Sequence, residues 1–118
     1  MPADASPVLL VEDEDTIRQL YADRMREIGL TVCEASGVVE AMRIYERELP
    51  RIACVDGRLP DGSGADFARE IGLRGARVIL ITNDQELYED PPAGVELAVL
   101  KINLSPIALA AAIQGLMA

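Results

Sequence analysis

The sequence predicts an α/β protein in which a parallel sheet is covered by helices on both faces. Short apolar runs alternate five times with segments of helical pattern along the 118 residues. The apolar runs show no two-residue alternation, which is typical of strands buried on both faces of a parallel sheet. Charged or hydroxyl side chains end four of the runs. We therefore expect parallel strands joined by right-handed crossovers, with polar groups gathered at one edge of the sheet.

The predicted strands are short. They are Val8–Val11, Thr31–Ala35, Ile52–Asp56, Val78–Thr82 and Leu97–Leu100.

The first two predicted helices follow capping residues. Asp15 is a favourable N-cap for the first helix, which Gly29 should end. Its expected core-facing residues are Ile17, Leu20, Tyr21, Met25 and Ile28. Ser36 should cap the second helix, which Pro50 should end. Its expected inward face comprises Val39, Met42 or Ile44, and Leu49.

The other three helices differ in length. Ser63, with Asp66 three residues later, resembles a capping box for a helix that buries Phe67 and Ile71. The segment Asp84–Asp90 predicts a short helix that Pro91-Pro92 curtails. Ser105-Pro106 is a strong start for a last helix over Ile107–Met117.

Composition narrows the function. The length fits one domain over residues 8–118, preceded by a flexible lead over residues 1–7 without signal-peptide character. A net charge of −9 argues against direct binding of nucleic acid or an anionic membrane, and the absence of histidine excludes imidazole catalysis. Cys33 and Cys54 fall in predicted strands, so we expect both to be buried free thiols. Free thiols are typical of a reducing compartment such as the cytoplasm.

The polar strand ends predict a metal and phosphoryl site. Asp56 closes an apolar strand and opens a Gly/Pro loop, and Glu12-Asp13-Glu14-Asp15 follows the first strand. Two carboxylates about 4 Å apart repel by roughly 4 kcal/mol at an effective dielectric of about 20. We therefore expect Mg²⁺ beside Glu12, Asp13 and Asp56.

With a cation present, the other strand ends acquire chemical roles. Asp56 can attack a phosphoryl donor to give an aspartyl phosphate. Lys101 would offset charge on the transferring oxygens, and the Thr82 hydroxyl would donate a hydrogen bond. None of these residues is specific alone; their joint placement at strand ends carries the prediction.

These residues resemble the response-regulator receiver domains of two-component signalling, over nearly the whole chain. The resemblance lies in Val-Glu-Asp-Glu-Asp at 11–15, Val-Asp-Gly-Arg-Leu-Pro-Asp-Gly-Ser-Gly at 55–64, Ile-Leu-Ile-Thr at 79–82 and Val-Leu-Lys at 99–101.

The resemblance implies a phosphoacceptor domain rather than an enzyme. Glu12 and Asp13 would hold Mg²⁺ together with Asp56 and the backbone carbonyl of Arg58, and Asp56 would accept phosphate from a histidine kinase or phosphotransfer protein. Thr82 and Lys101 would bind the phosphoryl oxygens. The implied fold is a flavodoxin-like three-layer sandwich whose five strands lie in the order 2-1-3-4-5.

Four positions depart from the family pattern. Ile102 stands where a proline with a cis peptide bond usually follows the lysine, and we expect a trans bond here. Asn83, which replaces a small residue, could bind the phosphoryl group or crowd the pocket. Ala98 replaces a switch aromatic, with Tyr88 a weak substitute. The stretch from Thr82 to Lys101 is short, which predicts an abbreviated fourth helix.

Further roles follow from position. Arg58 lies two residues beyond Asp56, and Asp84 lies two residues beyond Thr82. An ion pair between Arg58 and Asp84 could lengthen the lifetime of the phosphoryl group. If both charges are instead solvated, they would contribute little. In the family the first helix faces the kinase, which makes Ile17, Gln19 and Tyr21 contact candidates. Signal output would need a downstream protein or an output domain outside this chain.

Three alternative functions make different demands on the sequence. An aspartyl phosphatase would need a second acid where Arg58 stands, and a nucleotide-binding fold would need a glycine-rich loop after the first strand. The strongest alternative is a receiver-like protein-interaction module with weak or no dependence on phosphorylation, which the departures at Asn83, Ala98 and Ile102 favour.

Overall fold

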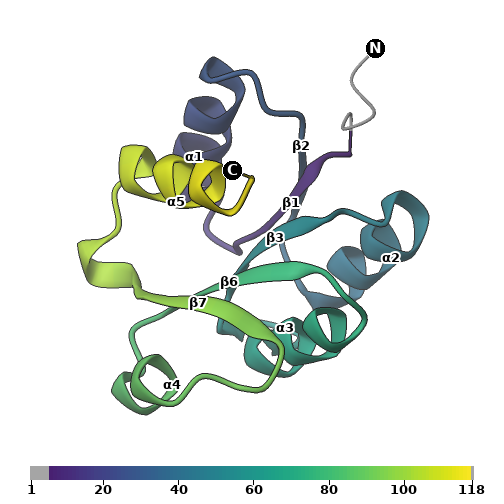
Figure 1. Ribbon diagram of the computed structural model, residues 1–118, viewed down its shortest axis with the longest axis vertical. Helices are drawn as coiled ribbons and strands as arrows, with labels where there is room; N and C mark the ends of the chain where they lie inside the picture. The colour runs from purple at the N-terminus through teal and green to yellow at the C-terminus, as the bar shows by residue number, and fades with distance from the viewer. Residues whose placement is uncertain (1–5, 118) are drawn as a thin grey trace.

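A five-stranded parallel sheet forms the centre of the molecule. The structure is a computed structural model that describes residues 6–117, so most of the expected lead over residues 1–7 lies outside the described residues. The strands lie in the order β2-β1-β3-β6-β7 (Figure 1). The bounds are β1 Val8–Val11, β2 Val32–Ala35, β3 Ile52–Asp56, β6 Arg77–Thr82 and β7 Val95–Leu100. Counted along the chain, this is the predicted order 2-1-3-4-5.

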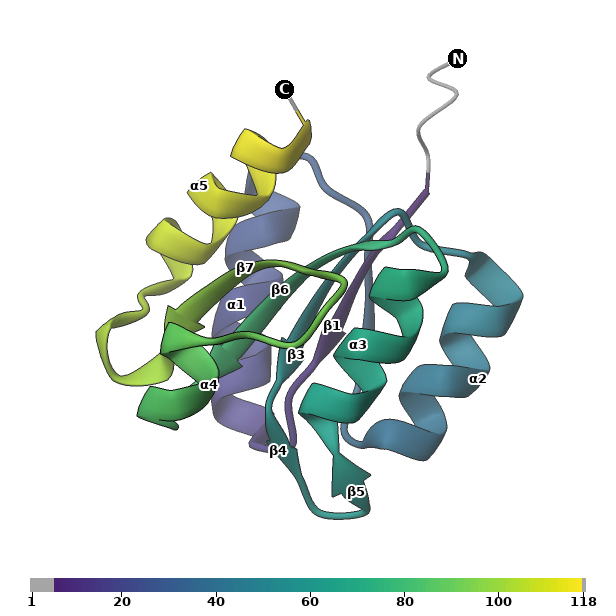
Figure 2. The same cartoon turned by 60° about the horizontal axis from the view of Figure 1, so that its bottom comes forward.

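Helices cover both faces of the sheet, as predicted. In Figure 2, α1 and α5 lie on one side, and α2 and α3 lie on the other. Their bounds are α1 Asp15–Glu27, α2 Val38–Glu48, α3 Gly64–Leu73 and α5 Pro106–Met117. The fourth helix is the abbreviated one, because α4 spans only Gln85–Glu89. The 3₁₀ turn η1, Lys101–Asn103, joins β7 to α5. No helix within residues 6–117 is long and apolar enough to cross a membrane.

Two apolar cores result from the strand geometry. Successive side chains of a strand point to opposite faces, so Leu9 and Val11 join the core under α2 and α3, whereas Val8 and Leu10 join the core under α1 and α5. Phe67 and Ile71 are buried as predicted. Cys54 is buried and Cys33 is partly buried, and both are free thiols.

The predicted apolar stripes of the first two helices were partly wrong. Leu20, Val39 and Leu49 are exposed by 54%, 59% and 66%. Tyr21, Met25 and Ile44 are buried as predicted, and the other inward positions belong to Ala22, Ala41 and Tyr45. Alanine lets a helix approach the sheet closely. The predicted apolar stripes contained only larger side chains, so they did not include these alanines.

Two predicted helix caps were also wrong. Glu14, not Asp15, is the N-cap of α1, and Asp15 lies in the first turn as an ion-pair partner of Arg18. The N-cap of α2 is Gly37 rather than Ser36. The Ser63 and Ser105 caps are confirmed, because their hydroxyl oxygens accept the N–H groups of Asp66 and Ala108.

An antiparallel strand pair that the sequence did not predict follows β3. It joins β4, Arg58–Leu59, to β5, Gly62–Ser63. The tip of this hairpin reaches α2, where the carboxylate of Asp61 accepts the N–H groups of Val38 and Val39. A side chain on Gly37 would lie only 2.7 Å from that carboxylate, which explains the glycine.

Candidate functional site

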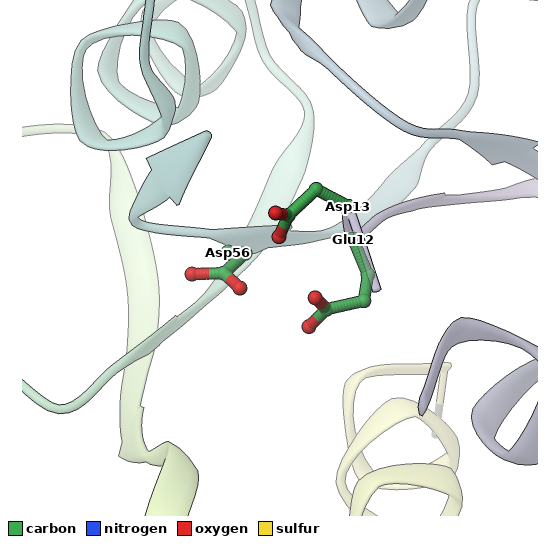
Figure 3. A group of neighbouring side chains, drawn as sticks. All are labelled: Glu12, Asp13 and Asp56. Carbon is green, nitrogen blue, oxygen red and sulfur yellow. The ribbon is translucent and has the colours of Figure 1, made fainter. Parts of the chain in front are cut away.

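Three carboxyl groups converge at the carboxyl edge of the sheet. Glu12 and Asp13 directly follow β1, Asp56 ends β3, and these two strands pair in parallel. One oxygen of each residue lies within 4.8 Å of the others (Figure 3). Glu12 and Asp56 are buried, whereas Asp13 is exposed. The cluster therefore has two fixed acids at its base and one at its mouth.

Lys101 reaches the cluster from the end of β7. Its Nζ lies 2.6 Å from Oδ2 of Asp56 and 3.0 Å from Oε1 of Glu12. Burial alone would lower the pKa of Lys101, but its hydrogen bond to Asp56 and its ion pair with Glu12 raise that pKa above its ordinary value. Lys101 is the only lysine in the sequence and one of the predicted site residues.

Glu12 is in an unusual state for a carboxyl group. Burial raises its pKa to about 7, although a hydrogen bond from the Glu14 backbone N–H lowers it. Its Oε1 lies near Lys101 but has no well-aligned hydrogen bond within residues 6–117. A buried carboxyl oxygen without a full set of partners, next to two further carboxylates, fits a hard divalent cation such as Mg²⁺.

Thr82 ends β6, the strand that pairs with β3. It is buried, and its Oγ1 accepts the backbone N–H of Asp84 at 2.9 Å, so the hydroxyl proton is free to be donated. Thr82 and Asp56 line the same cavity of about 400 Å³. The other predicted site residues that line it are Asp13, Arg58, Asn83, Asp84 and Lys101.

Gly64 is a positioning residue that the sequence reasoning missed. A Cβ atom at this position would lie 1.8 Å from the backbone oxygen of Asp56. The N–H groups of Gly64 and Ala65 both donate to the carbonyl oxygen of Gly57. The start of α3 is therefore seated directly under the loop that carries Asp56, and only glycine allows this approach.

The remaining predicted site residues show contacts of other kinds. Within residues 6–117 no ion pair joins Arg58 to Asp84, whose carboxylate instead caps α4 by accepting the N–H groups of Glu86 and Leu87. The Asn83 side-chain oxygen accepts the backbone N–H of Ile102. Ala98 is partly buried in β7, and the ring of Tyr88 is 40% exposed.

The expected kinase contacts are only partly available. Tyr21 is buried in the core beneath α1, so packing excludes it as a contact residue. Gln19 is exposed. The peptide bond between Lys101 and Ile102 is trans, as are the others within residues 6–117.

The fold and the acidic site define a class of signalling domain, and comparison identifies the family. Residues 8–102 match the family model of the response regulator receiver domain. This chain therefore belongs to the response regulator receiver family, whose members are generally non-enzymatic signalling modules that interact with histidine kinases or phosphotransfer proteins.

Curated relatives are longer than this chain. The DNA-binding transcriptional activator DevR/DosR of Mycobacterium tuberculosis is 31% identical, over 80% of this chain and 46% of the relative. The KDP operon transcriptional regulatory protein KdpE of Escherichia coli is 27% identical, over 75% of this chain and 40% of the relative. The chain thus spans less than half the length of either relative.

Solved structures share the fold. A CheY-like receiver domain protein from Methanospirillum hungatei superposes with a TM-score of 0.82 at 21% identity, covering 95% of this chain and 93% of that one. The response regulator TrrA from Thermotoga maritima, in complex with Mg²⁺ and beryllofluoride, has a TM-score of 0.82 at 24% identity, covering 94% and 98%.

Proposed function

We propose that this domain accepts a phosphoryl group on Asp56, with Mg²⁺, from a histidine kinase or a phosphotransfer protein in the cytoplasm. The observation that supports this function is the convergence of Glu12, Asp13 and Asp56 within 4.8 Å, next to the Lys101 ammonium. We further propose that the phosphorylated domain signals through altered docking to a downstream protein or to an output domain outside this chain.

The site residues have distinct roles in the proposed reaction. An Asp56 oxygen attacks the phosphorus of a phosphohistidine, and the P–N bond breaks with its electron pair going to the imidazole nitrogen. The leaving imidazole takes up a proton from water. Lys101, now bound to Oδ2 of Asp56, moves onto an oxygen of the transferred group, and the Thr82 hydroxyl donates to another.

Mg²⁺ fits the acidic end of the same cavity. Glu12, Asp13, Asp56 and the backbone carbonyl of Arg58 would hold it, and it would supply positive charge against the phosphoryl oxygens. Glu12 and Asp13 would bind the cation without occupying the Asp56 oxygen that attacks the phosphoryl donor. Asn83, Arg58 and Asp84 also line this cavity. The side-chain N–H₂ of Asn83 would donate to a phosphoryl oxygen, and Arg58 and Asp84 would flank the approach of water.

Phosphorylation can be tested with small donors. Incubation with Mg²⁺ and acetyl phosphate should add one phosphoryl group to the wild type, detected by intact-protein mass spectrometry. Asp56→Asn should gain none. Asp23→Asn removes the same charge from an exposed position on α1 and should react as the wild type does. An unchanged wild-type mass, or equal labelling of Asp56→Asn, contradicts the function.

A second function, constitutive protein recognition, is favoured by exposed apolar side chains on three consecutive elements. Leu97, Ile102 and Ile107 are exposed by 39%, 80% and 64% on β7, η1 and α5. Addition of Mg²⁺ and beryllofluoride separates the two functions by amide NMR. A phosphorylation-dependent surface should show shifts at these residues, whereas a constitutive one should show shifts only around the cavity.

A further inference from the structure

Two departures from the family pattern meet in the structure. The Oδ1 of Asn83 accepts the backbone N–H of Ile102 at 2.8 Å, although the residues are 19 positions apart. They lie at the carboxyl ends of β6 and β7, which pair side by side (Figure 1). A proline at position 102 has no N–H group, so this bond requires a residue other than proline there.

The hydrogen bond joins the two segments that carry the phosphoryl-binding groups. Asn83 directly follows Thr82, and Ile102 directly follows Lys101. The hydrogen bond from the Asp84 N–H to Thr82 Oγ1 closes the turn around Asn83. Asn83 therefore connects this turn to the backbone segment that directly follows Lys101.

The segment after Lys101 has few other anchors. The Ile102 side chain is 80% exposed and belongs to neither apolar core. On β7, the position of the usual switch aromatic is held by Ala98. The next inward anchor along the chain is Leu104, which packs against the core under α1 and α5.

We propose that Asn83 is a positioning residue that holds Thr82 and Lys101 at a fixed separation across the cavity. Asn83 and Ile102 form a matched pair, in which the amide acceptor replaces the conformational lock that a proline supplies. The pair also links the Thr82 turn to η1. This inference rests on the proposed function, because its effect is on phosphoryl binding.

The test compares Asn83→Ala with a matched control. Asn103→Ala removes the same side-chain amide from η1, and Asn103 has no side-chain hydrogen bond within residues 6–117. The first measurement is hydrogen exchange of the Ile102 amide by NMR, which is independent of phosphorylation. Exchange should accelerate in Asn83→Ala alone, by about twofold to tenfold for the loss of one hydrogen bond.

The second measurement is beryllofluoride affinity in the presence of Mg²⁺. It should fall by about twofold to tenfold in Asn83→Ala and remain at the wild-type value in Asn103→Ala. Ile102→Pro removes the donor of the same bond. If Asn83 acts through Ile102, Asn83→Ala should cause no further loss of affinity in the Ile102→Pro background.

Three results would overturn the inference in distinguishable ways. If wild type and Asn83→Ala bind beryllofluoride equally, Asn83 has no positioning role. If Asn83→Ala weakens binding as much in the Ile102→Pro background as alone, Asn83 acts by direct contact with the phosphoryl group. If the wild type itself does not bind beryllofluoride, the proposed function fails and the positioning role fails with it.

Discussion

At the scale of single residues, the site depends on one ammonium that contacts two acids from different strands. Lys101 approaches both Asp56 and Glu12 within 3.0 Å. A charged group with two partners of opposite sign holds its proton more tightly than a solvated one. Lys101 therefore stays a cation throughout the pH range in which phosphoryl transfer would occur, and its charge is available to the transferred group.

This property can be measured directly because the chain contains one lysine. Selective ¹³C labelling of lysine gives one Cε signal, whose shift reports protonation. Its midpoint should lie at higher pH in the folded protein than in urea, since the hydrogen bond to Asp56 and the ion pair with Glu12 raise the Lys101 pKa. The Lys101 ammonium thus stabilises the fold at pH values below its ordinary pKa. This stabilisation is lost as the pH rises through the pKa of Lys101 in the folded state.

Substitution identifies the partner responsible for the shift. Asp56→Asn should lower the Lys101 midpoint, because one carboxylate partner becomes neutral. Asp23→Asn, on the exposed surface of α1, should leave it where it is in the wild type. A wild-type midpoint equal to that of the denatured chain would show that the ion pairs are not maintained in solution.

At the scale of elements, the loop after Asp56 is hydrogen-bonded to a helix on one face of the sheet. Asp61 lies at the tip of the β4–β5 hairpin and accepts the N–H groups of Val38 and Val39, at 2.7 Å and 3.1 Å. These donors begin α2 and would otherwise lack partners. The carboxylate thus acts as an N-cap supplied from a distant part of the chain.

We predict that Asp61→Asn lowers the thermal midpoint at neutral pH, because an amide offers one acceptor oxygen where the carboxylate offers two. The two N–H donors lower the Asp61 pKa in the folded state. The Asp61 carboxylate therefore stabilises the fold above its ordinary pKa of 3.8. This stabilisation is lost as the pH falls through the pKa of Asp61 in the folded state. The difference between variant and wild type, followed by circular dichroism, should vanish in acid.

A matched control separates capping from net charge. Asp90→Asn removes the same charge from an exposed residue whose side chain has no hydrogen bond within residues 6–117. It should leave the midpoint close to that of the wild type. Equal effects of the two substitutions, or an Asp61→Asn effect that persists in acid, would contradict the capping role.

Asp61 also shows what could and could not be predicted from the sequence. Strand ends such as Asp56 and Thr82 were predictable, because an apolar run and the residue that ends it are local features. The Asp61 cap was not, since it joins residues 22 and 23 positions apart. Gly64 was missed for the same reason: its contact with the Asp56 backbone exists only after α3 docks.

At the scale of the whole molecule, the fold concentrates negative charge in a protein that is already acidic. The net charge is −9, and strand order places Glu12 and Asp13 beside Asp56 at one edge. The ends of the paired strands β1 and β3 hold these acids close together, so a bound cation would offset their repulsion. A cation that binds this edge therefore stabilises the folded chain as a whole.

We predict that Mg²⁺ raises the thermal midpoint of the wild type. At ten times the dissociation constant, binding to the folded state alone adds about 1.4 kcal/mol to the free energy of unfolding. For a domain of this size the corresponding rise is roughly 5 °C. In Asp13→Asn most of this increment should disappear, because one of three clustered carboxylates is lost.

Screening of the overall charge by salt is the competing explanation for such a rise. Asp23→Asn changes the net charge as much as Asp13→Asn does but lies outside the cluster, so its Mg²⁺ increment should equal that of the wild type. KCl at matched ionic strength should reproduce little of the effect, because screening does not need three converging oxygens. If Mg²⁺ stabilises Asp13→Asn and the wild type equally, the cation acts on the general charge and the acidic cluster is not its site.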